Sequence, residues 1–283
     1  MTQHTITSVG IIGLGIIGGG IAALIQQYVP SCKVKGYDPN PAALRLKASH
    51  IVDEITESIA HAVESVDLVI IATPIAAVIT VLEDVLSIVG PNTIITDVAS
   101  VKAPIVDAIR KLNTNHIIIP GHPMGGTHRH GVAHISGDYL RHAHYILTPM
   151  ENQSIPDVFL SFLKDLTFNV TTMDATRHDQ FIAKTSHFPY LISSAMVSMF
   201  TDQVDAMQPL MGPGINSMTR LSASSLAWGE SVCQHSKPIL IEMIDEFQTI
   251  LTQLKADLND HEAVSTFLRH AQQIRKSVWQ DDP

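Results

Sequence analysis

The chain has 283 residues, of which 45% are hydrophobic and 16% are charged. This composition is that of a globular protein with room for two domains, and it excludes a disordered chain. The formal net charge of −9 argues against nonspecific binding to nucleic acid. Cys32 and Cys233 form no metal or redox motif, which fits a reducing compartment, and we expect a cytoplasmic protein.

Residues 9–25 are almost wholly apolar and raise the question of a membrane segment. Six glycines interrupt the run, it has no basic flank, and no cleavage-like site follows it. A buried strand that turns into a buried helix explains it better, so we expect no membrane association.

The first strand, at residues 8–12, ends in a G-x-G-x-x-G motif made by Gly13, Gly15 and Gly18. A helical pattern follows, and this context is what a dinucleotide-binding fingerprint requires. Gly13 would allow the tight turn, Gly15 the approach of a pyrophosphate, and Gly18 close helix packing. The N-terminal turn of the helix, which contains Ile17, would offer free N–H groups to the phosphates.

A second strand is predicted at residues 32–37 and is followed by Asp38, which lies 20 residues beyond Gly18. Asp38 would accept hydrogen bonds from both ribose hydroxyls and would repel a 2′-phosphate, so NAD is favoured over NADP. The alternative is a glycine-rich turn that binds no cofactor.

Further apolar runs alternate with helical stretches, which predicts an α/β fold with a parallel, doubly wound sheet. Ligands of such sheets bind beyond the carboxyl ends of the strands, where Thr73 with Pro74, Ser100 and His122 all fall. We expect the last strand to close this sheet. The runs are residues 67–72, 93–98, 116–120, 145–148 and 169–173.

His122 stands between Pro120 and Pro123 in a glycine-rich segment that we interpret as a loop. Proline fixes φ and glycine permits unusual backbone conformations, so the segment can hold the imidazole in one place. The alternative is a loop histidine that is satisfied by the backbone.

The second half of the chain shows only helical patterns. Apolar residues recur at helical spacing over residues 181–200, 239–254 and 264–274, and Pro189 is expected near a bend or break. We therefore predict a nucleotide-binding domain at residues 1–173 and an all-helical domain at residues 174–283, with no further regulatory domain.

Motifs along nearly the whole chain resemble, in order and spacing, those of the prephenate and arogenate dehydrogenases, the NAD(P)-linked enzymes of tyrosine biosynthesis. The Asp-x-x-Ser-Val-Lys and Gly-His-Pro-Met motifs are specific to that family rather than to the fold. The matching segments are residues 13–18, 72–74, 96–102, 121–127, 147–149, 178–179, 186–189, 212–214 and 219–220.

The resemblance implies NAD-dependent oxidative decarboxylation of prephenate to 4-hydroxyphenylpyruvate. His122 would accept the hydroxyl proton, because an imidazole titrates near neutral pH, and Ser100 would bind the same hydroxyl or the nicotinamide ribose. Arg220 would bind a substrate carboxylate through its fixed fork. The remaining substrate-binding candidates are His187, His178 and Thr127. Family members are dimers, so we expect a homodimer through the helical domain.

Several of these residues have structural alternatives. Ser100 could cap the helix that follows it, and Arg220 could belong to an ion pair between domains. His187 and His178 could be satisfied core histidines, and Lys102 could reach the site or lie in solvent.

Two segments depart from the family's pattern. The chain has Thr127-His128-Arg129 where many relatives carry Ser-Glu or Thr-Glu, which could alter pH dependence or substrate preference. Residues 222–228 lack the Asp-Pro that usually precedes the tryptophan.

A cluster of histidines follows the His122 segment, and its His-x-His spacing invites a metal interpretation. No cysteine lies among them, and the proposed chemistry needs no metal, so we expect none. The histidines are His128, His130, His134, His142 and His144.

Three other functions stay open. An arogenate dehydrogenase would act on a substrate that differs only in its side chain. A 3-hydroxyacid-type dehydrogenase would need a catalytic lysine, for which Lys184 is placed, although Gly-His-Pro-Met argues against it. A dinucleotide sensor without catalysis is disfavoured by the joint presence of Ser100, His122, His187 and Arg220.

Overall fold

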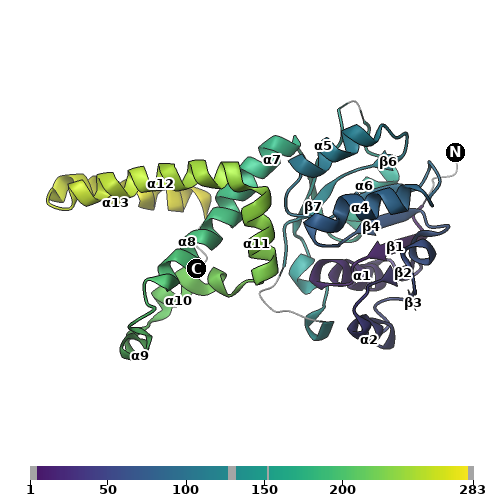
Figure 1. Cartoon of the computed structure of the whole chain (residues 1–283), viewed down its shortest axis with the longest axis horizontal. Helices are drawn as coiled ribbons and strands as arrows, with labels where there is room; N and C mark the ends of the chain where they lie inside the picture. Colours follow the sequence, from purple (N-terminus) through teal and green to yellow (C-terminus); the bar gives the residue numbers. More distant parts are fainter. Residues whose placement is uncertain (1–4, 127–131, 152, 280–283) are drawn as a thin grey trace. The chain divides into compact units, whose positions relative to one another are not determined.

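The computed structural model describes residues 5–126, 132–151 and 153–279. The chain forms two compact units, Met1–Lys237 and Pro238–Pro283, and each is described by itself (Figure 1). Thr127, His128 and His130, on which predictions were made, lie outside the described residues.

Six parallel strands form the main sheet, in the order β3-β2-β1-β4-β5-β6. Val9 of the central strand pairs with Val34 on one side and with Leu68 on the other. The predicted parallel, doubly wound sheet is therefore confirmed. The strands are β1 (Ser8–Ile12), β2 (Lys33–Tyr37), β3 (Glu54–Ile55), β4 (Leu68–Ile71), β5 (Ile94–Asp97) and β6 (Ile117–Ile118).

Helices connect these strands. They are α1 (Ile16–Tyr28), α2 (Leu44–Ala48), α3 (Ile59–Val63), α4 (Ile75–Leu86) and α5 (Ala103–Leu112), and a further helix, α6 (Asp157–Asp165), comes later in the chain. Short 3₁₀ helices cover Pro41–Ala43, Val132–His134 and Asp138–Leu140.

The sheet separates two apolar cores, because successive side chains of a strand point to opposite faces. In β4, Ile70 packs with side chains of α1 and α6, whereas Val69 and Ile71 pack with those of α3, α4 and α5. Each fully buried aliphatic side chain contributes about 1.5–3 kcal/mol to stability. This burial on both faces explains why β4 has the continuous apolar sequence Leu-Val-Ile-Ile.

A second, three-stranded sheet contains β7 (Gly121–Pro123), β8 (His144–Leu147) and β9 (Asn169–Thr172). The prediction of a loop around His122 was therefore wrong. His122 lies in β7, which runs antiparallel to β8, and it pairs with Ile146. Prolines, which lack an N–H donor, are tolerated there because β7 is an edge strand. The expectation that residues 169–173 close the main sheet was also wrong, since β9 pairs with β8 in the second sheet and with no described strand of the main sheet.

The chain is helical from Ala175 onward in the part that the structure describes, as expected. The Asp174 carboxylate caps α7 (Ala175–Ile182) by accepting the N–H groups of Thr176 and Arg177. The helices that follow α7 in this unit are α8 (Phe188–Ser198), α9 (Val204–Met207), α10 (Pro213–Thr219) and α11 (Leu226–His235), with 3₁₀ turns at Gln208–Leu210 and Arg220–Ala223. The domain boundary between residues 173 and 174 stays a prediction.

A π-helical turn, Ala183–His187, joins α7 to α8. The N–H of Phe188 donates to the carbonyl of Ala183, five residues back, and Pro189 follows in the first turn of α8. An α-helical register would set the Pro189 ring against the carbonyl of Thr185, so the break expected near Pro189 takes this form.

The second unit consists of α12 (Lys237–Asp257), which begins one residue before it, and α13 (His261–Val278). Asp260 caps α13 by accepting the N–H groups of Glu262 and Ala263. Large apolar side chains on both helices are exposed, among them Ile250, Leu251, Phe267 and Leu268. None of the helices among the described residues is both long and apolar enough to cross a membrane.

Candidate active site

The three glycines of the motif before and within α1 are required for different structural reasons. Gly13 has φ +93°, and a Cβ there would lie 2.5 Å from the carbonyl oxygen of Ala72. A Cβ on Gly18 would collide with the Gly13 carbonyl oxygen. A Cβ on Gly15, by contrast, would meet no atom within 4 Å. Packing therefore explains Gly13 and Gly18 but not Gly15, where open space is what the approach of a phosphate requires.

The N-terminus of α1 carries no side-chain cap and no acidic residue in its first turn, which contains Ile17. Its free N–H groups and positive dipole end are suited to phosphate oxygens. Asp38, directly after β2, orients the loop before this helix, because its Oδ2 accepts the N–H of Leu14 at 2.7 Å. A surface hollow beside it is lined by Tyr37, Asp38, Pro39, Asn40, Pro41, Ala43, Leu44, Ile55, Thr56 and Glu57.

Thr73 follows β4 at the same edge of the sheet, and its backbone nitrogen would lie 3.0 Å from a Cβ on Gly13. Its hydroxyl is buried without a hydrogen-bond partner in the described part of the chain. A buried polar group without a partner is uncommon, so Thr73 is suited to a bound ligand. Pro74 begins the turn into α4.

The 3₁₀ helix Asp138–Leu140 lies against α1. The Tyr139 hydroxyl donates to the carbonyl of Ile16 at 2.6 Å, and burial raises the pKa of this phenol to about 12. Gly19 and Gly20 of α1 permit this packing, since Cβ atoms there would strike Ile135 and Tyr139. Residues 135–140 are thus anchored beside α1.

Lys102 is fully buried, so the solvent-exposed alternative is wrong. Its ammonium contacts the Asp97 carboxylate at the end of β5 and donates to the Gly121 carbonyl oxygen at 2.7 Å. Burial lowers the pKa of Lys102, and the neighbouring Asp97 carboxylate opposes that effect. Lys102 thus joins the main sheet to the strand that carries His122.

The described residues engage one ring nitrogen of His122. Its Nδ1 lies 2.9 Å from Nε2 of His178, and Nδ1 of His178 lies 2.7 Å from Oδ1 of Asp179. All three residues are buried. Both ring nitrogens of His178 are therefore engaged, which leaves none for the substrate contact that was predicted for it.

Burial is the largest cause of a pKa of His122 well below its ordinary value of 6.5. Positive charge on His178, Lys102 and His187 would oppose its protonation further. His122 is therefore neutral at pH 7, as a proton acceptor must be.

Asp179 also binds the N-terminus of α5. Its carboxylate accepts the N–H of Lys102 at 2.7 Å and the N–H of Ala103 at 2.8 Å. The alternative in which Ser100 caps this helix is thus not what the structure shows. Ser100 is half-buried between β5 and α5, with no hydrogen bond from its hydroxyl to any described residue.

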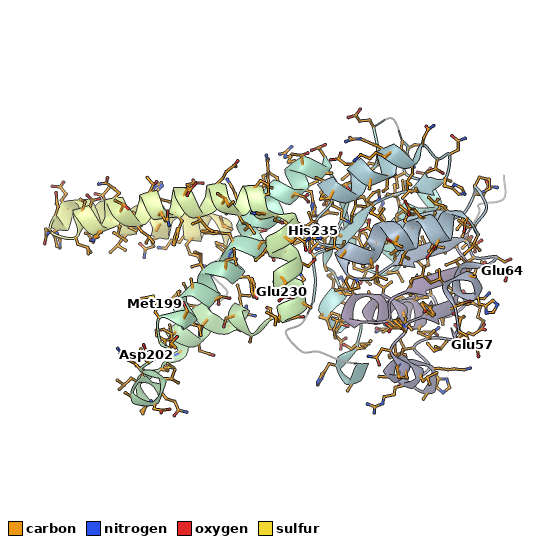
Figure 2. The ribbon with its side chains drawn as sticks, viewed as in Figure 1. Glu57, Glu64, Met199, Asp202, Glu230 and His235 are labelled. Carbon is orange, nitrogen blue, oxygen red and sulfur yellow. The ribbon has the colours of Figure 1, made fainter. Side chains whose placement is uncertain are left out.

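His187, at the end of the π-helical turn, is buried beside Trp228. Its Nδ1 lies 3.1 Å from the Ser236 hydroxyl, and its Nε2 has no partner in the described chain. Burial lowers the pKa of His187 to about 4. His235, at the end of α11, likewise has a buried Nε2 without a partner there (Figure 2).

Arg220 is exposed at the start of a 3₁₀ turn and has no ion pair with a described residue. The structure does not bring it into contact with His122. Among the described residues, no three histidines, cysteines or acids cluster as a metal site would require. The expectation of no metal stays a prediction, because His128 and His130 lie outside those residues.

The sequence did not assign a role to Asp179, Ser236 or His235. Asp179 has a signal, since it directly follows His178 in a motif shared with the family. No local sequence pattern marks Ser236 or His235, because only the folded chain brings α11 next to the π-helical turn.

Two family profiles match the chain. Residues 21–170 match the nucleotide-binding domain of prephenate dehydrogenase, and residues 174–273 match its dimerization domain. Together they span most of the chain, although the glycine motif precedes the first match.

Curated relatives and a solved structure agree with these two profile matches. A prephenate dehydrogenase of Lactococcus lactis subsp. cremoris is 30% identical over 277 residues, covering 95% of this chain and 76% of the relative. A cyclohexadienyl dehydrogenase of Zymomonas mobilis subsp. mobilis is 27% identical, covering 95% and 94%. The solved structure of prephenate dehydrogenase from A. aeolicus with hydroxyphenyl propionate and NAD+ has a TM-score of 0.87 at 24% identity, covering 98% of this chain and 100% of that one, so it has the same fold.

The profiles and the relative from Lactococcus lactis confirm the resemblance seen in the motifs. The chain belongs to the prephenate dehydrogenase family.

Proposed function

We propose that the protein catalyses the NAD-dependent oxidative decarboxylation of prephenate to 4-hydroxyphenylpyruvate. One observation carries this proposal beyond the family name. His122 is a buried, neutral imidazole whose Nδ1 is held by His178, so its Nε2 is the nitrogen left for the substrate. The reaction requires such a base for the proton of the ring hydroxyl.

The residues of the first βα turn fit NAD. Gly15 leaves open space at the uncapped N-terminus of α1, and the Thr73 hydroxyl has no partner among the described residues. Gly13, Gly15, Ile17 and Gly18 would hold the pyrophosphate, and Asp38 would hold the adenosine ribose. Thr73 and Pro74 would line the side toward the nicotinamide. Bound NAD would supply the hydride acceptor.

The protein's own residues handle the proton and the carboxylates. His122 Nε2 takes the hydroxyl proton as the carbon that bears this hydroxyl loses its hydride. The ring carboxylate then leaves as carbon dioxide, its bonding electrons make the ring an aromatic phenolate, and the phenolate oxygen takes back the proton that His122 holds. A positioned base contributes ~10²–10⁴-fold in rate.

Ser100 would donate a hydrogen bond to the same hydroxyl or to the nicotinamide ribose. Its free hydroxyl and its place after β5 support this role. Arg220 would bind a carboxylate of the substrate through two parallel N–H groups, which its lack of an ion pair with described residues permits. His187 would present its unpartnered Nε2 to the substrate. Thr127, also assigned to the substrate, lies outside the described residues.

Arogenate is the second candidate substrate. It differs from prephenate only in carrying an amino acid side chain in place of the keto acid. The relative from Zymomonas mobilis has the broader name cyclohexadienyl dehydrogenase, which supports testing both substrates.

We also propose that the protein is a cytoplasmic homodimer. The match of residues 174–273 to a dimerization domain supports the dimer, as do the exposed apolar side chains Met199, Leu210, Leu251 and Leu268. The cytoplasmic location rests on the composition and cysteine content alone.

The test is an assay with NAD and either prephenate or arogenate, monitored by the absorbance of reduced nicotinamide. Prephenate should give the higher kcat/KM, and NADP should be used less well than NAD because of Asp38. Absence of turnover with both substrates would refute the proposed function. Turnover with arogenate alone would replace prephenate by the second candidate.

A further inference from the structure

We propose that His178 and Asp179 are positioning residues that fix the tautomer of His122 and leave its Nε2 as the free base. The inference rests on the proposed function, since it assigns how the base of that reaction is prepared. Neither residue touches substrate or cofactor in this proposal.

The tautomers follow from the order of donors and acceptors. A carboxylate only accepts hydrogen bonds, so Asp179 requires a hydrogen on Nδ1 of His178 at 2.7 Å. A neutral His178 then has a lone pair on Nε2, which accepts a hydrogen bond from Nδ1–H of His122 at 2.9 Å. His122 must therefore carry its lone pair on Nε2.

The carboxylate is held from a second direction. Lys102 and Ala103 donate their backbone N–H groups to Oδ1 and Oδ2 of Asp179, and these N–H groups lie at the positive end of the α5 dipole. With His178, three donors fix the carboxylate. The chain of contacts therefore starts from a rigid helix end and not from a mobile side chain.

Burial strengthens the arrangement. His178 is fully buried, Asp179 is 4% exposed and His122 is 8% exposed. Water cannot readily exchange for these partners, and hydrogen bonds in such surroundings are stronger than in solvent. When His122 takes up a proton, its positive charge is stabilised by the Asp179 carboxylate through His178.

A purely structural role is the competing explanation, because buried polar networks also stabilise folds. The two roles differ in what a glutamine at position 178 should do. Its carbonyl can accept from His122 Nδ1–H and its amide N–H can donate to Asp179, so His178→Gln keeps both contacts. His178→Leu keeps neither.

Tautomer and turnover should be measured on the same full-length variants. Nitrogen NMR of isotope-labelled histidine should show His122 with its hydrogen on Nδ1 in the unaltered protein, with His122→Asn used to assign the signal. In Asp179→Asn, the uncharged amide has one acceptor oxygen for the three donors of His178, Lys102 and Ala103, so it no longer fixes the hydrogen of His178 on Nδ1. The kcat of this variant should fall by ~10²–10⁴-fold, with the KM for NAD changed less than about threefold.

His178→Leu should lower kcat by at least ~10²-fold, and His178→Gln should restore it to within about tenfold of the unaltered protein. His61→Gln, at an exposed histidine of α3, is the matched control and should change neither property. A hydrogen on Nε2 of His122 in the unaltered protein would overturn the proposal. So would a kcat of folded His178→Leu within about threefold of normal, or His178→Gln as inactive as His178→Leu.

The two proposals fail separately. If the unaltered protein oxidises neither cyclohexadienol, the proposed function falls, whereas the NMR measurement still decides the tautomer. If His178→Leu does not fold, the NMR signal of the unaltered protein and the kcat of His178→Gln test the positioning role.

Discussion

The ammonium of Lys102 donates to the backbone carbonyl oxygen of Gly121 at 2.7 Å and so ties the end of β5 to the strand that carries His122. The same ammonium is the charge partner of Asp97, and both side chains are buried. Removal of one partner from a buried ion pair leaves an uncompensated charge, which usually destabilises a protein strongly.

Lys102→Met should therefore reduce the free energy of unfolding by about 3–5 kcal/mol, measured in urea. The double variant Lys102→Met/Asp97→Asn removes both charges and should lose less than the sum of the two single variants. Additive losses would show that the two side chains do not interact energetically.

Gly13 and Gly15 provide a matched pair for the cofactor site. Gly13→Ala places a Cβ against the Ala72 carbonyl at a φ of +93° and should destabilise the fold by more than about 1 kcal/mol. The added Cβ of Gly15→Ala meets no atom of the described residues, so thermal unfolding should be unchanged while the Kd for NAD rises at least about tenfold. Unaltered NAD binding by Gly15→Ala would remove this residue from the cofactor site.

The main sheet was predictable because its strands are buried on both faces and leave long apolar runs. The second sheet was not, because β7 has only three residues and contains a glycine and a proline. Glycine and proline indicate a loop in local sequence, and only pairing with β8, over 20 residues later, makes this segment a strand.

The candidate site was predictable where motifs are local, as at Gly13 to Gly18 and at His122. The network behind His122 depends on contacts across 56 to 77 positions of the chain, such as His122 with His178 and Lys102 with Asp179. No spacing rule links such residues, so Asp179 stayed without a role and Lys102 without a place until the chain was folded.

His122→Asn should reduce kcat by at least ~10²-fold, because the amide cannot accept a proton at neutral pH. The Kd for NAD should stay within about threefold, since the predicted cofactor residues lie in other loops. NAD affinity is measured by titration of protein fluorescence, and catalysis by reduced nicotinamide. Unchanged turnover would exclude His122 as the base.

The free energy of unfolding should decrease as the pH is lowered from 6.5 to 4. Burial lowers the folded-state pKa of His187 to about 4, below the unfolded value of 6.5, so the unfolded chain binds more protons in this window. The stability from neutral His187 is complete above pH 6.5 and declines by up to about 1.4 kcal/mol per pH unit as the pH falls. His122, whose pKa is also lowered, acts in the same direction.

The measurement is the Tm at pH 7 and at pH 5. His187→Gln should show a smaller decrease in Tm from pH 7 to pH 5 than the unaltered protein. His61→Gln, at an exposed site, should show the same decrease as the unaltered protein. Equal decreases for the unaltered protein and His187→Gln would contradict a neutral, buried His187.

Arg220 separates substrate binding from chemistry. Arg220→Ala should raise the KM for prephenate about tenfold or more, with kcat reduced much less, because a carboxylate contact made equally in ground and transition states affects mainly KM. Arg220→Lys keeps the charge but loses the fork of two parallel N–H groups, so its KM should lie between those of the alanine variant and the unaltered protein. Because Arg220 is exposed and has no ion pair with a described residue, both variants should keep the Tm of the unaltered protein, and equal Tm values check this. An unaltered KM in Arg220→Ala would show that this arginine does not bind the substrate.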